Sequence, residues 1–182
     1  MRISSFRAPV RRALIVLVSS LVYCLMAGLR AAPPETGNVE LKVVKYDELE
    51  AVVRAQKGHV VVIDVWADFC VPCKKMLPHL LEMQRKYAAD GLVVMTVSVD
   101  DPGQREAALK FLQKIKATGP NYLMGEKVEF WQKKWKINGP PASFVFDRDG
   151  KRAMRFDSDD PDKPYDHEDV EKVVKDLLRA KP

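Results

Sequence analysis

Two nearly uninterrupted apolar stretches predict the central strands of a sheet. Residues 60–65 and 92–99 are rich in valine, with isoleucine, leucine and methionine, a composition typical of strands covered on both faces. Shorter apolar segments predict four further strands, at 39–45, 121–124, 142–146 and 151–156.

Helical spacing of apolar residues separates these strands. The predicted helices cover 47–56, 70–88, 104–116, 126–136 and 167–180. We expect Asp47 to cap the first helix and Pro78 to kink the second. In the fourth helix, Phe130, Trp131 and Trp135 are expected to pack in the core rather than to hold a cofactor. Strands that alternate with helices predict an α/β fold.

Two cysteines stand where the strand at 60–65 gives way to the helix at 70–88. If Cys70 lies at or just before the first helical position, its sulfur faces unpaired backbone N–H groups and the positive end of the helix dipole, which favour a thiolate. Cys73 lies about one turn further along the same side, within reach of a disulfide. Cys70 is therefore the candidate nucleophile, and Cys73 is the candidate resolving thiol.

Positive charge is concentrated at the N-terminus. The chain has 182 residues and a formal net charge of +5, a length typical of one domain with its own core. Residues 1–31 hold five arginines and no acidic residue, which leaves 25 basic residues against 25 acidic ones. A neutral body without a basic stripe gives no electrostatic basis for nucleic-acid binding.

The N-terminus has the layout of a secretory signal peptide. A basic section ends at Arg11 and Arg12, and an uncharged apolar run follows at 13–29. This run is about as long as a short membrane span, so an uncleaved membrane anchor is the alternative. The sequence thus divides into a signal peptide or anchor, a linker and a folded domain, at 1–32, 33–38 and 39–182.

Cysteine usage favours redox chemistry over a metal site. Cys24 lies in the apolar N-terminal run, so the folded domain holds two cysteines, both in the motif. An exported protein with one such pair is better explained by redox chemistry than by a structural staple. A zinc site would need two more ligands, and His59, His79 and His167 are not at ligand spacing. The acidic loop at 157–166 lacks the pattern of a calcium loop. We therefore expect no metal and no cofactor.

The surroundings of the cysteine pair resemble the thioredoxin-like redox motif. The matching residues lie on the preceding strand, before the first cysteine and around the second: Asp64, Trp66, Pro72, Lys74 and Pro78. Residues 100–136 also contain a helix and a strand that a minimal thioredoxin lacks. This insertion resembles the exported TlpA/ResA-like thiol-disulfide oxidoreductases.

The resemblance implies a thioredoxin-like fold, with a central mixed β-sheet and helices on both faces. The inserted helix and strand would lie between the half that carries the cysteines and the half that carries a cis-proline. Pro141 aligns with that cis-proline, which the family holds beside the disulfide. Because Pro140 has no N–H to donate, docking of an extended substrate by backbone pairing should be weaker or differently arranged.

The resemblance also implies a protein-disulfide reductase. The Cys70 thiolate would attack a client disulfide, and Cys73 would release the reduced product. Asp64 would take the proton from Cys73 through water, although a carboxylate with only structural hydrogen bonds is the alternative. Trp66 would wall the site, and Lys74 would either tune the thiolate or be solvated.

Pro72, at the second middle position of the motif, resembles the reducing members of the family rather than strong oxidants. The expected location is periplasmic or extracytoplasmic. The expected partners are disulfide-containing proteins and an exported or membrane-bound thiol donor. If the N-terminal segment is not cleaved, residues 13–29 would anchor the chain in a membrane. Two alternatives stay open: a copper-binding metallochaperone of Sco type, whose cysteines are spaced one residue wider, and a non-catalytic binding module with the same fold.

Overall fold

The computed structural model describes residues 38–159, 162 and 164–180. The predicted signal peptide or anchor at 1–32 lies outside these residues, as does all but the last residue of the predicted linker. Within the described ranges, no helix is both long and apolar enough to cross a membrane.

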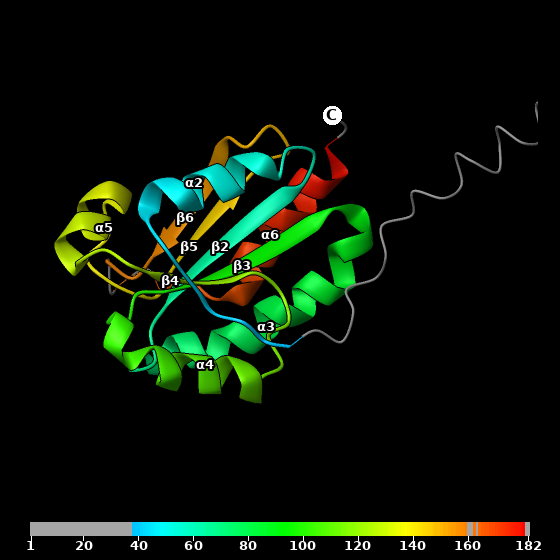
Figure 1. Cartoon of the computed structure of the whole chain (residues 1–182). Helices are drawn as coiled ribbons and strands as arrows, with labels where there is room; N and C mark the ends of the chain where they lie inside the picture. The colour runs from blue at the N-terminus through cyan, green and yellow to red at the C-terminus, as the bar shows by residue number, and fades with distance from the viewer. Residues whose placement is uncertain (1–37, 160–161, 163, 181–182) are drawn as a thin grey trace, which may run out of the picture. The chain divides into compact units, whose positions relative to one another are not determined.

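The described chain alternates between strands and helices along its length (Figure 1). The strands are β1 (Lys42–Val44), β2 (Val60–Trp66), β3 (Leu92–Ser98), β4 (Asn121–Met124), β5 (Ala142–Phe146) and β6 (Arg152–Asp157). The α-helices are α2 (Tyr46–Ala55), α3 (Val71–Tyr87), α4 (Arg105–Lys114), α5 (Val128–Trp135) and α6 (His167–Arg179). Each strand and helix expected from the apolar pattern is present, which confirms the predicted α/β class.

The strands form one mixed sheet in the order β1-β4-β3-β2-β5-β6. The first four strands in this order are parallel, and β5 and β6 are antiparallel to their neighbours. The sheet therefore places β2, which leads into the cysteine motif, directly beside β5, which follows Pro141. In this register Asp64 of β2 lies between Thr96 of β3 and Ser143 of β5.

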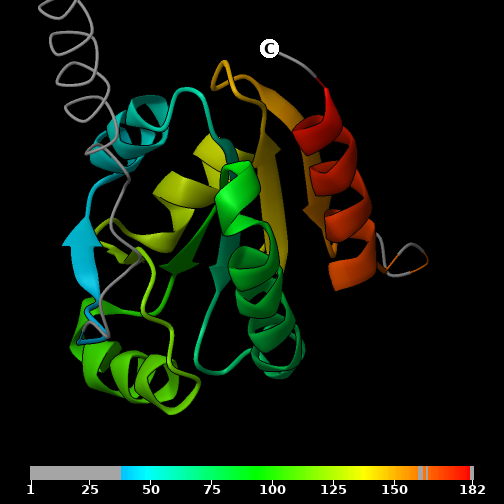
Figure 2. The ribbon, with the colours of Figure 1, turned by 90° about the vertical axis from the view of Figure 1, so that its right-hand side faces the viewer.

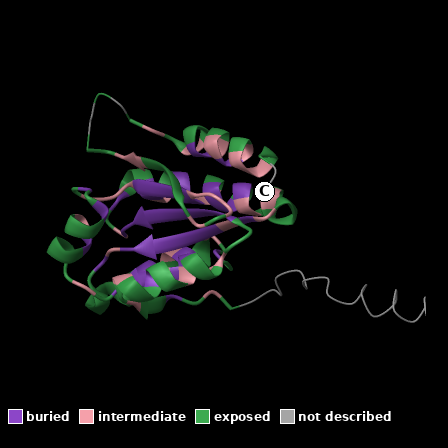
Figure 3. Cartoon of the chain, turned by 90° about the horizontal axis from the view of Figure 1, so that it is seen from above, coloured by how far each residue is buried: buried purple, intermediate pink, exposed green. Residues whose placement is uncertain are grey.

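Helices cover both faces of this sheet, as the resemblance implies. Every residue of β2 is buried, and its side chains alternate between two apolar clusters. Val61, Ile63 and Val65 pack on the face covered by α2 and α5. Val60 and Val62 pack on the opposite face, where α3 and α6 lie side by side (Figure 2). Figure 3 shows the buried strands between the partly exposed helices.

The structure corrects two local predictions in the first part of the chain. The first strand covers Lys42–Val44 rather than 39–45. The N-cap of α2 is Lys45 rather than Asp47, and the backbone N–H of Lys45 donates to the Glu48 carboxylate at 2.7 Å. Asp47 lies too late to cap, inside the first helical turn, where its charge still favours the helix dipole.

The aromatic residues of α5 are divided between the core and the surface. Trp131 and Trp135 are buried in the cluster beneath α2, as expected. Phe130 is 41% exposed, so the prediction that it packs in the core is wrong. Successive positions on a helix point about 100° apart, and Phe130 lies on the solvent side of its neighbour.

Candidate active site

The cysteine pair lies at the point where the chain leaves the sheet and enters α3. Cys70 is the N-cap of this helix, and its sulfur accepts a hydrogen bond from the backbone N–H of Cys73 at 3.3 Å. The two cysteines form a disulfide, with Cα atoms 5.3 Å apart. Pro72 lies in the first turn, where its missing N–H leaves no helical bond unmade. The helix N-terminus therefore directs a backbone donor at the first sulfur, as the sequence predicts.

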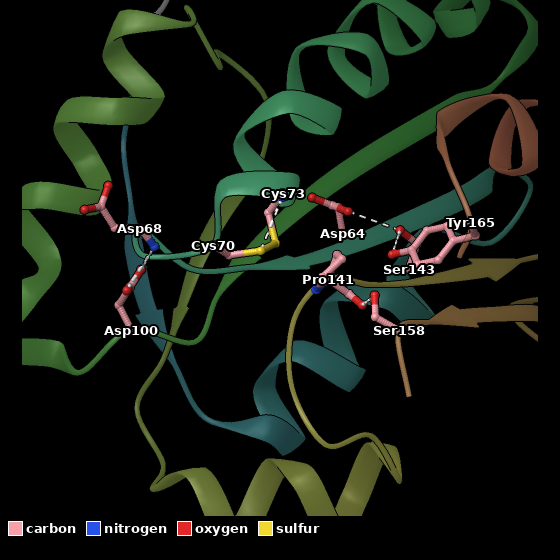
Figure 4. Close-up of a disulfide and its surroundings, with 9 residues drawn as sticks. All are labelled: Asp64, Asp68, Cys70, Cys73, Asp100, Pro141, Ser143, Ser158 and Tyr165. Carbon is pink, nitrogen blue, oxygen red and sulfur yellow. Dashed lines mark hydrogen bonds between the residues drawn. A yellow bond between two sulfur atoms is a disulfide. The ribbon is translucent and has the colours of Figure 1, made fainter. Parts of the chain in front are cut away.

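The turn before Cys70 is fastened to the end of β3. The backbone N–H of Asp68 donates to both carboxylate oxygens of Asp100, at 3.0 and 2.9 Å, and the Ser98 hydroxyl donates to the same carboxylate at 2.8 Å. The backbone N–H of Cys70 closes the turn onto Ala67 at 3.0 Å. These bonds fix the position of Cys70 relative to the sheet (Figure 4).

Lys74 is engaged with a partner of its own. Its Nζ lies 2.5 Å from a carboxylate oxygen of Asp68 and 5.1 Å from the centre of the Phe111 ring. The ammonium group is therefore neither freely solvated nor left unpaired beside the sulfurs. Its positive charge is balanced by Asp68, in the turn just before Cys70.

Asp64 is completely buried on β2 beneath the disulfide. The Ser143 hydroxyl donates to its Oδ1 at 3.1 Å, while Oδ2 has no hydrogen-bond partner among the described residues. Figure 4 shows this second oxygen directed toward Cys73. Burial raises the pKa of Asp64 to about 7, opposed in part by the Ser143 hydrogen bond. A carboxyl group with this pKa can exchange a proton near neutral pH.

The predicted cis-proline lies next to the disulfide (Figure 4). The Pro140–Pro141 peptide bond is cis, as the alignment with the family indicates. The Ser158 hydroxyl donates to the carbonyl of Pro141 at 3.2 Å, and the Asp159 carboxylate accepts the N–H of Asn138 at 3.0 Å. The segment after β6 thus supports the proline loop from outside.

Apolar side chains contact the disulfide from the protein core, and two further ones flank Cys70 at the protein surface. Trp66 is completely buried in one cluster with both cysteines, and its ring lies 5.3 Å from that of Phe111. Phe69 and Val71, on either side of Cys70, are 73% and 62% exposed. An apolar rim is therefore available to a partner that approaches Cys70.

Three residues of the site were not predicted from the sequence: Asp100, Ser143 and Tyr165. Alternation along β5 could have identified Ser143, because Ala142 and Phe144 point into the opposite cluster and Ser143 must face the side of Asp64. Tyr165 lies in the segment before α6 and carries no comparable signal. Its hydroxyl is 3.2 Å from the Ser143 hydroxyl oxygen.

His79, His167 and Asp166 make contacts around the start of α6. His79 of α3 stacks on His167 of α6, with ring centres 4.1 Å apart. Asp166 caps α6 by accepting the backbone N–H groups of its first turn, at 2.8 and 3.2 Å. Over the described ranges, no three histidine, cysteine or acidic side chains are grouped so that they could hold a metal ion.

Comparison with known proteins assigns this arrangement to a family. Residues 58–152 match the family described as Thioredoxin-like. The match covers more than half of the chain, from just before β2 to the start of β6, and includes both cysteines and Pro141. The chain belongs to the thioredoxin-like family. The fold and the motif resemblance inferred from the sequence are therefore confirmed.

Two curated relatives of this thioredoxin-like chain carry names from one class. Sporulation thiol-disulfide oxidoreductase A of Bacillus subtilis (strain 168) is 26% identical over 139 residues, which cover 71% of this chain and 83% of the relative. Thiol-disulfide oxidoreductase ResA of Bacillus cereus is 29% identical over 97 residues, or 52% and 53% of the two chains. The chain thus matches about half the length of the ResA relative.

A solved structure supports the fold independently. The thioredoxin domain of a thiol-disulfide oxidoreductase from Bacteroides vulgatus superposes with a TM-score of 0.58 at 22% identity. The superposition covers 69% of this chain and 83% of that domain. At this identity the likeness speaks for the fold alone.

Proposed function

We propose that this thioredoxin-like protein is a thiol-disulfide oxidoreductase that reduces disulfides of exported proteins. The observation that carries the proposal is the Cys70–Cys73 disulfide at the N-terminus of α3, in which the first sulfur accepts the N–H of the second cysteine. The names of the two curated relatives support the same activity. Pro72 in the motif favours the reducing direction.

In the proposed reaction the reduced protein transfers two electrons to a client. The Cys70 thiolate attacks one sulfur of the client disulfide, so that a mixed disulfide forms and the first client thiolate leaves. Cys73 then gives up its proton, and its sulfur attacks the Cys70 sulfur. The bond between Cys70 and the client breaks, the second client thiolate leaves, and Cys70 and Cys73 are joined again.

Asp64 is the proposed acceptor of the Cys73 proton, directly or through one water molecule. Its Oδ2 is free of hydrogen bonds to the described residues and is directed at Cys73. Burial holds its pKa at about 7, so the ionised form is a base of suitable strength near neutral pH. The same carboxyl group can return a proton when the disulfide is reduced again by the electron donor.

Clients would approach across the apolar rim formed by Phe69 and Val71. These side chains flank Cys70 and are mostly exposed, so an apolar stretch of a client can cover them. Pro140, before the cis bond, offers no N–H to pair with an extended chain. Side-chain contacts rather than strand pairing would therefore dominate the docking of a client.

The proposed location is outside the cytoplasm, with electrons supplied by an exported or membrane-bound thiol donor. This part of the proposal is supported by the N-terminal pattern, in which a basic section precedes the apolar run at 13–29. The mass of the protein in the membrane and soluble fractions of expressing cells tests what happens to this segment. A cleaved signal peptide gives a shorter protein, whereas an anchor gives the full-length mass in the membrane fraction.

The activity is tested with the full chain in an insulin reduction assay with dithiothreitol as the electron donor. We expect turnover above the dithiothreitol background, and background rates for Cys70→Ser. Background rates for the unmodified chain would contradict the proposal and support a non-catalytic binding module. A tight Cu(I) site in the reduced chain, without disulfide turnover, would support the copper-handling alternative instead.

A further inference from the structure

A row of three polar groups leads from beneath the disulfide to the surface. The Ser143 hydroxyl donates to Oδ1 of Asp64 at 3.1 Å, and its oxygen lies 3.2 Å from the Tyr165 hydroxyl. Asp64 and Ser143 are completely buried, whereas Tyr165 is partly exposed. Figure 4 shows the row on one side of Asp64 and Cys73 on the other. The row joins β2, β5 and the segment before α6 at the reacting site.

The chemistry of the groups fixes the direction of the hydrogen bonds when Asp64 is ionised. A carboxylate has no proton to donate, so Ser143 gives its single hydroxyl proton to Asp64. The Ser143 oxygen then accepts, and Tyr165 is the donor. Both protons point toward the negative charge, and hydrogen bonds in such a row strengthen one another. Protonation of Asp64 removes the charge and weakens the row.

Tyr165 can serve as this donor throughout the working pH range. Burial, followed by the negative charge of Asp64, raises the pKa of its hydroxyl above the ordinary value. Asp157 acts on it in the same direction, and Arg155 pairs with that aspartate at 2.8 Å. The Tyr165 hydroxyl therefore keeps its proton and remains available to Ser143.

We propose that Ser143 and Tyr165 are a positioning pair for the proton transfer at Cys73. They engage one oxygen of Asp64, leave the other free toward the thiol, and set the pH at which Asp64 becomes the base. The inference rests on the proposed reductase function. Both residues act through Asp64, and neither takes part in bond exchange at the sulfurs.

Few groups other than this pair act on Asp64. Its register partners on the neighbouring strands are Thr96 and Ser143, and neither ionises. The titratable group that faces it from α3 is Cys73, and the one that reaches its row from the segment before α6 is Tyr165. Burial and the Ser143 hydrogen bond are the causes of its pKa shift, and no charged side chain of the described residues is among them. A change at Ser143 or Tyr165 should thus be visible directly in the titration of Asp64.

The test follows the protonated carboxyl band of Asp64 by infrared difference spectroscopy on the full, oxidised chain. Asp64→Asn identifies the band by its loss. In Ser143→Ala, the loss of a hydrogen bond to a charged group should raise the midpoint by about one to two pH units. In Tyr165→Phe, the loss of one cooperative donor should raise it by about 0.3 units.

Two matched variants control for the loss of a hydroxyl elsewhere. Thr96→Val removes a buried hydroxyl that is in register with Asp64 but bonded to Asn121 at 2.8 Å. Tyr122→Phe removes a partly buried tyrosine hydroxyl on β4. Neither should move the Asp64 midpoint. A general loosening of the fold would lower the urea midpoint of a variant without this specific shift.

A second readout is the rate of single-turnover reduction of a disulfide peptide as a function of pH. The midpoint of this pH profile should rise more in Ser143→Ala than in Tyr165→Phe. An Asp64 band that titrates in Ser143→Ala within about 0.3 units of the unmodified chain would overturn the proposal. If Ser143→Ala does not fold, Tyr165→Phe decides, and a midpoint equal to that of Tyr122→Phe overturns it. A chain that reduces no disulfide refutes the reductase function, while the infrared titration still tests the pair.

Discussion

Cys70 and Cys73 are three residues apart, yet their surroundings differ. Cys70 caps α3, is 6% exposed, and stands between the exposed side chains of Phe69 and Val71. Cys73 is completely buried, one turn into the helix, with a carboxylate oxygen of Asp64 directed at it. The helix end stabilises a thiolate at the first position only. The second cysteine needs a separate base, and the sheet beneath it supplies one.

The largest effects are expected when the two cysteines are replaced one at a time. Cys70→Ser should abolish disulfide exchange, because the sulfur that attacks the client disulfide is gone. Cys73→Ser should form mixed disulfides with clients and fail to release them, because Cys70 can attack but nothing resolves the bond. Mass spectrometry after exposure to a disulfide peptide distinguishes the two. Equal behaviour of both variants would refute the assigned roles.

Asp64→Asn should separate the two cysteines kinetically. The neutral amide cannot accept the Cys73 proton, so the resolving step should slow by roughly 10- to 100-fold at pH 7. The attack by Cys70 should change little, because its helix N-terminus is intact. Rapid-quench analysis of the mixed disulfide measures both steps. Slowing of the first step alone would show that Asp64 acts on the wrong cysteine for this account.

The same variant should be more stable than the unmodified chain above neutral pH. The pKa of Asp64 is raised from 3.8 to about 7 in the folded protein, so the folded state binds the proton more tightly than the unfolded state. The free energy of unfolding is therefore highest below about pH 4, where Asp64 is protonated in both states. It falls between about pH 4 and 7 and stays at the lower value above pH 7. Urea unfolding at pH 8 should show a gain of up to about 4 kcal/mol for Asp64→Asn, and little gain at pH 4.

The matched control is Asp90→Asn, which changes an exposed aspartate near the end of α3. It should leave the free energy of unfolding unchanged within about 0.5 kcal/mol at both pH values. A similar gain in both variants would mean that net charge, rather than burial of Asp64, governs the pH dependence.

The smallest effect is expected at Lys74. Because its ammonium group is paired with Asp68, Lys74→Gln should change the rate of Cys70 alkylation by less than about twofold and the stability by at most about 1 kcal/mol. Lys75→Gln, at an exposed position of the same helix, is the control. A tenfold loss of thiolate reactivity in Lys74→Gln alone would show that Lys74 tunes Cys70.

Local patterns in the sequence predicted most of the fold. Apolar runs, helical spacing and the resemblance identified each strand and helix, because these features depend on residues close together in the chain. The resemblance implied a mixed sheet, but the order of its strands was not predicted, because strand pairing joins residues far apart in the chain. The wrong prediction of Asp47 as the N-cap shows the limit of local rules. The helix begins earlier, because the Glu48 carboxylate accepts the backbone N–H of Lys45 and the Glu126 carboxylate accepts that of Tyr46. Glu126 is 80 residues away in the chain.

The site was predicted in part for the same reason. Both cysteines, Asp64 and the cis bond before Pro141 belong to short motifs that can be recognised one at a time. Ser143 and Tyr165 matter only because β5 pairs with β2 and the segment before α6 folds back over that pairing. Their role depends on contacts between residues 22 and 79 positions apart. Alternation along β5 indicates only the face on which Ser143 lies, not its contact with Asp64 or Tyr165.

The most direct test of the central claim is the reduction potential of the Cys70–Cys73 pair in the full chain, measured by equilibration in dithiothreitol buffers of known potential. A reductase should have a potential near that of thioredoxin, about −270 mV. A value near −120 mV, that of a strong disulfide donor, would contradict the proposed direction of the reaction.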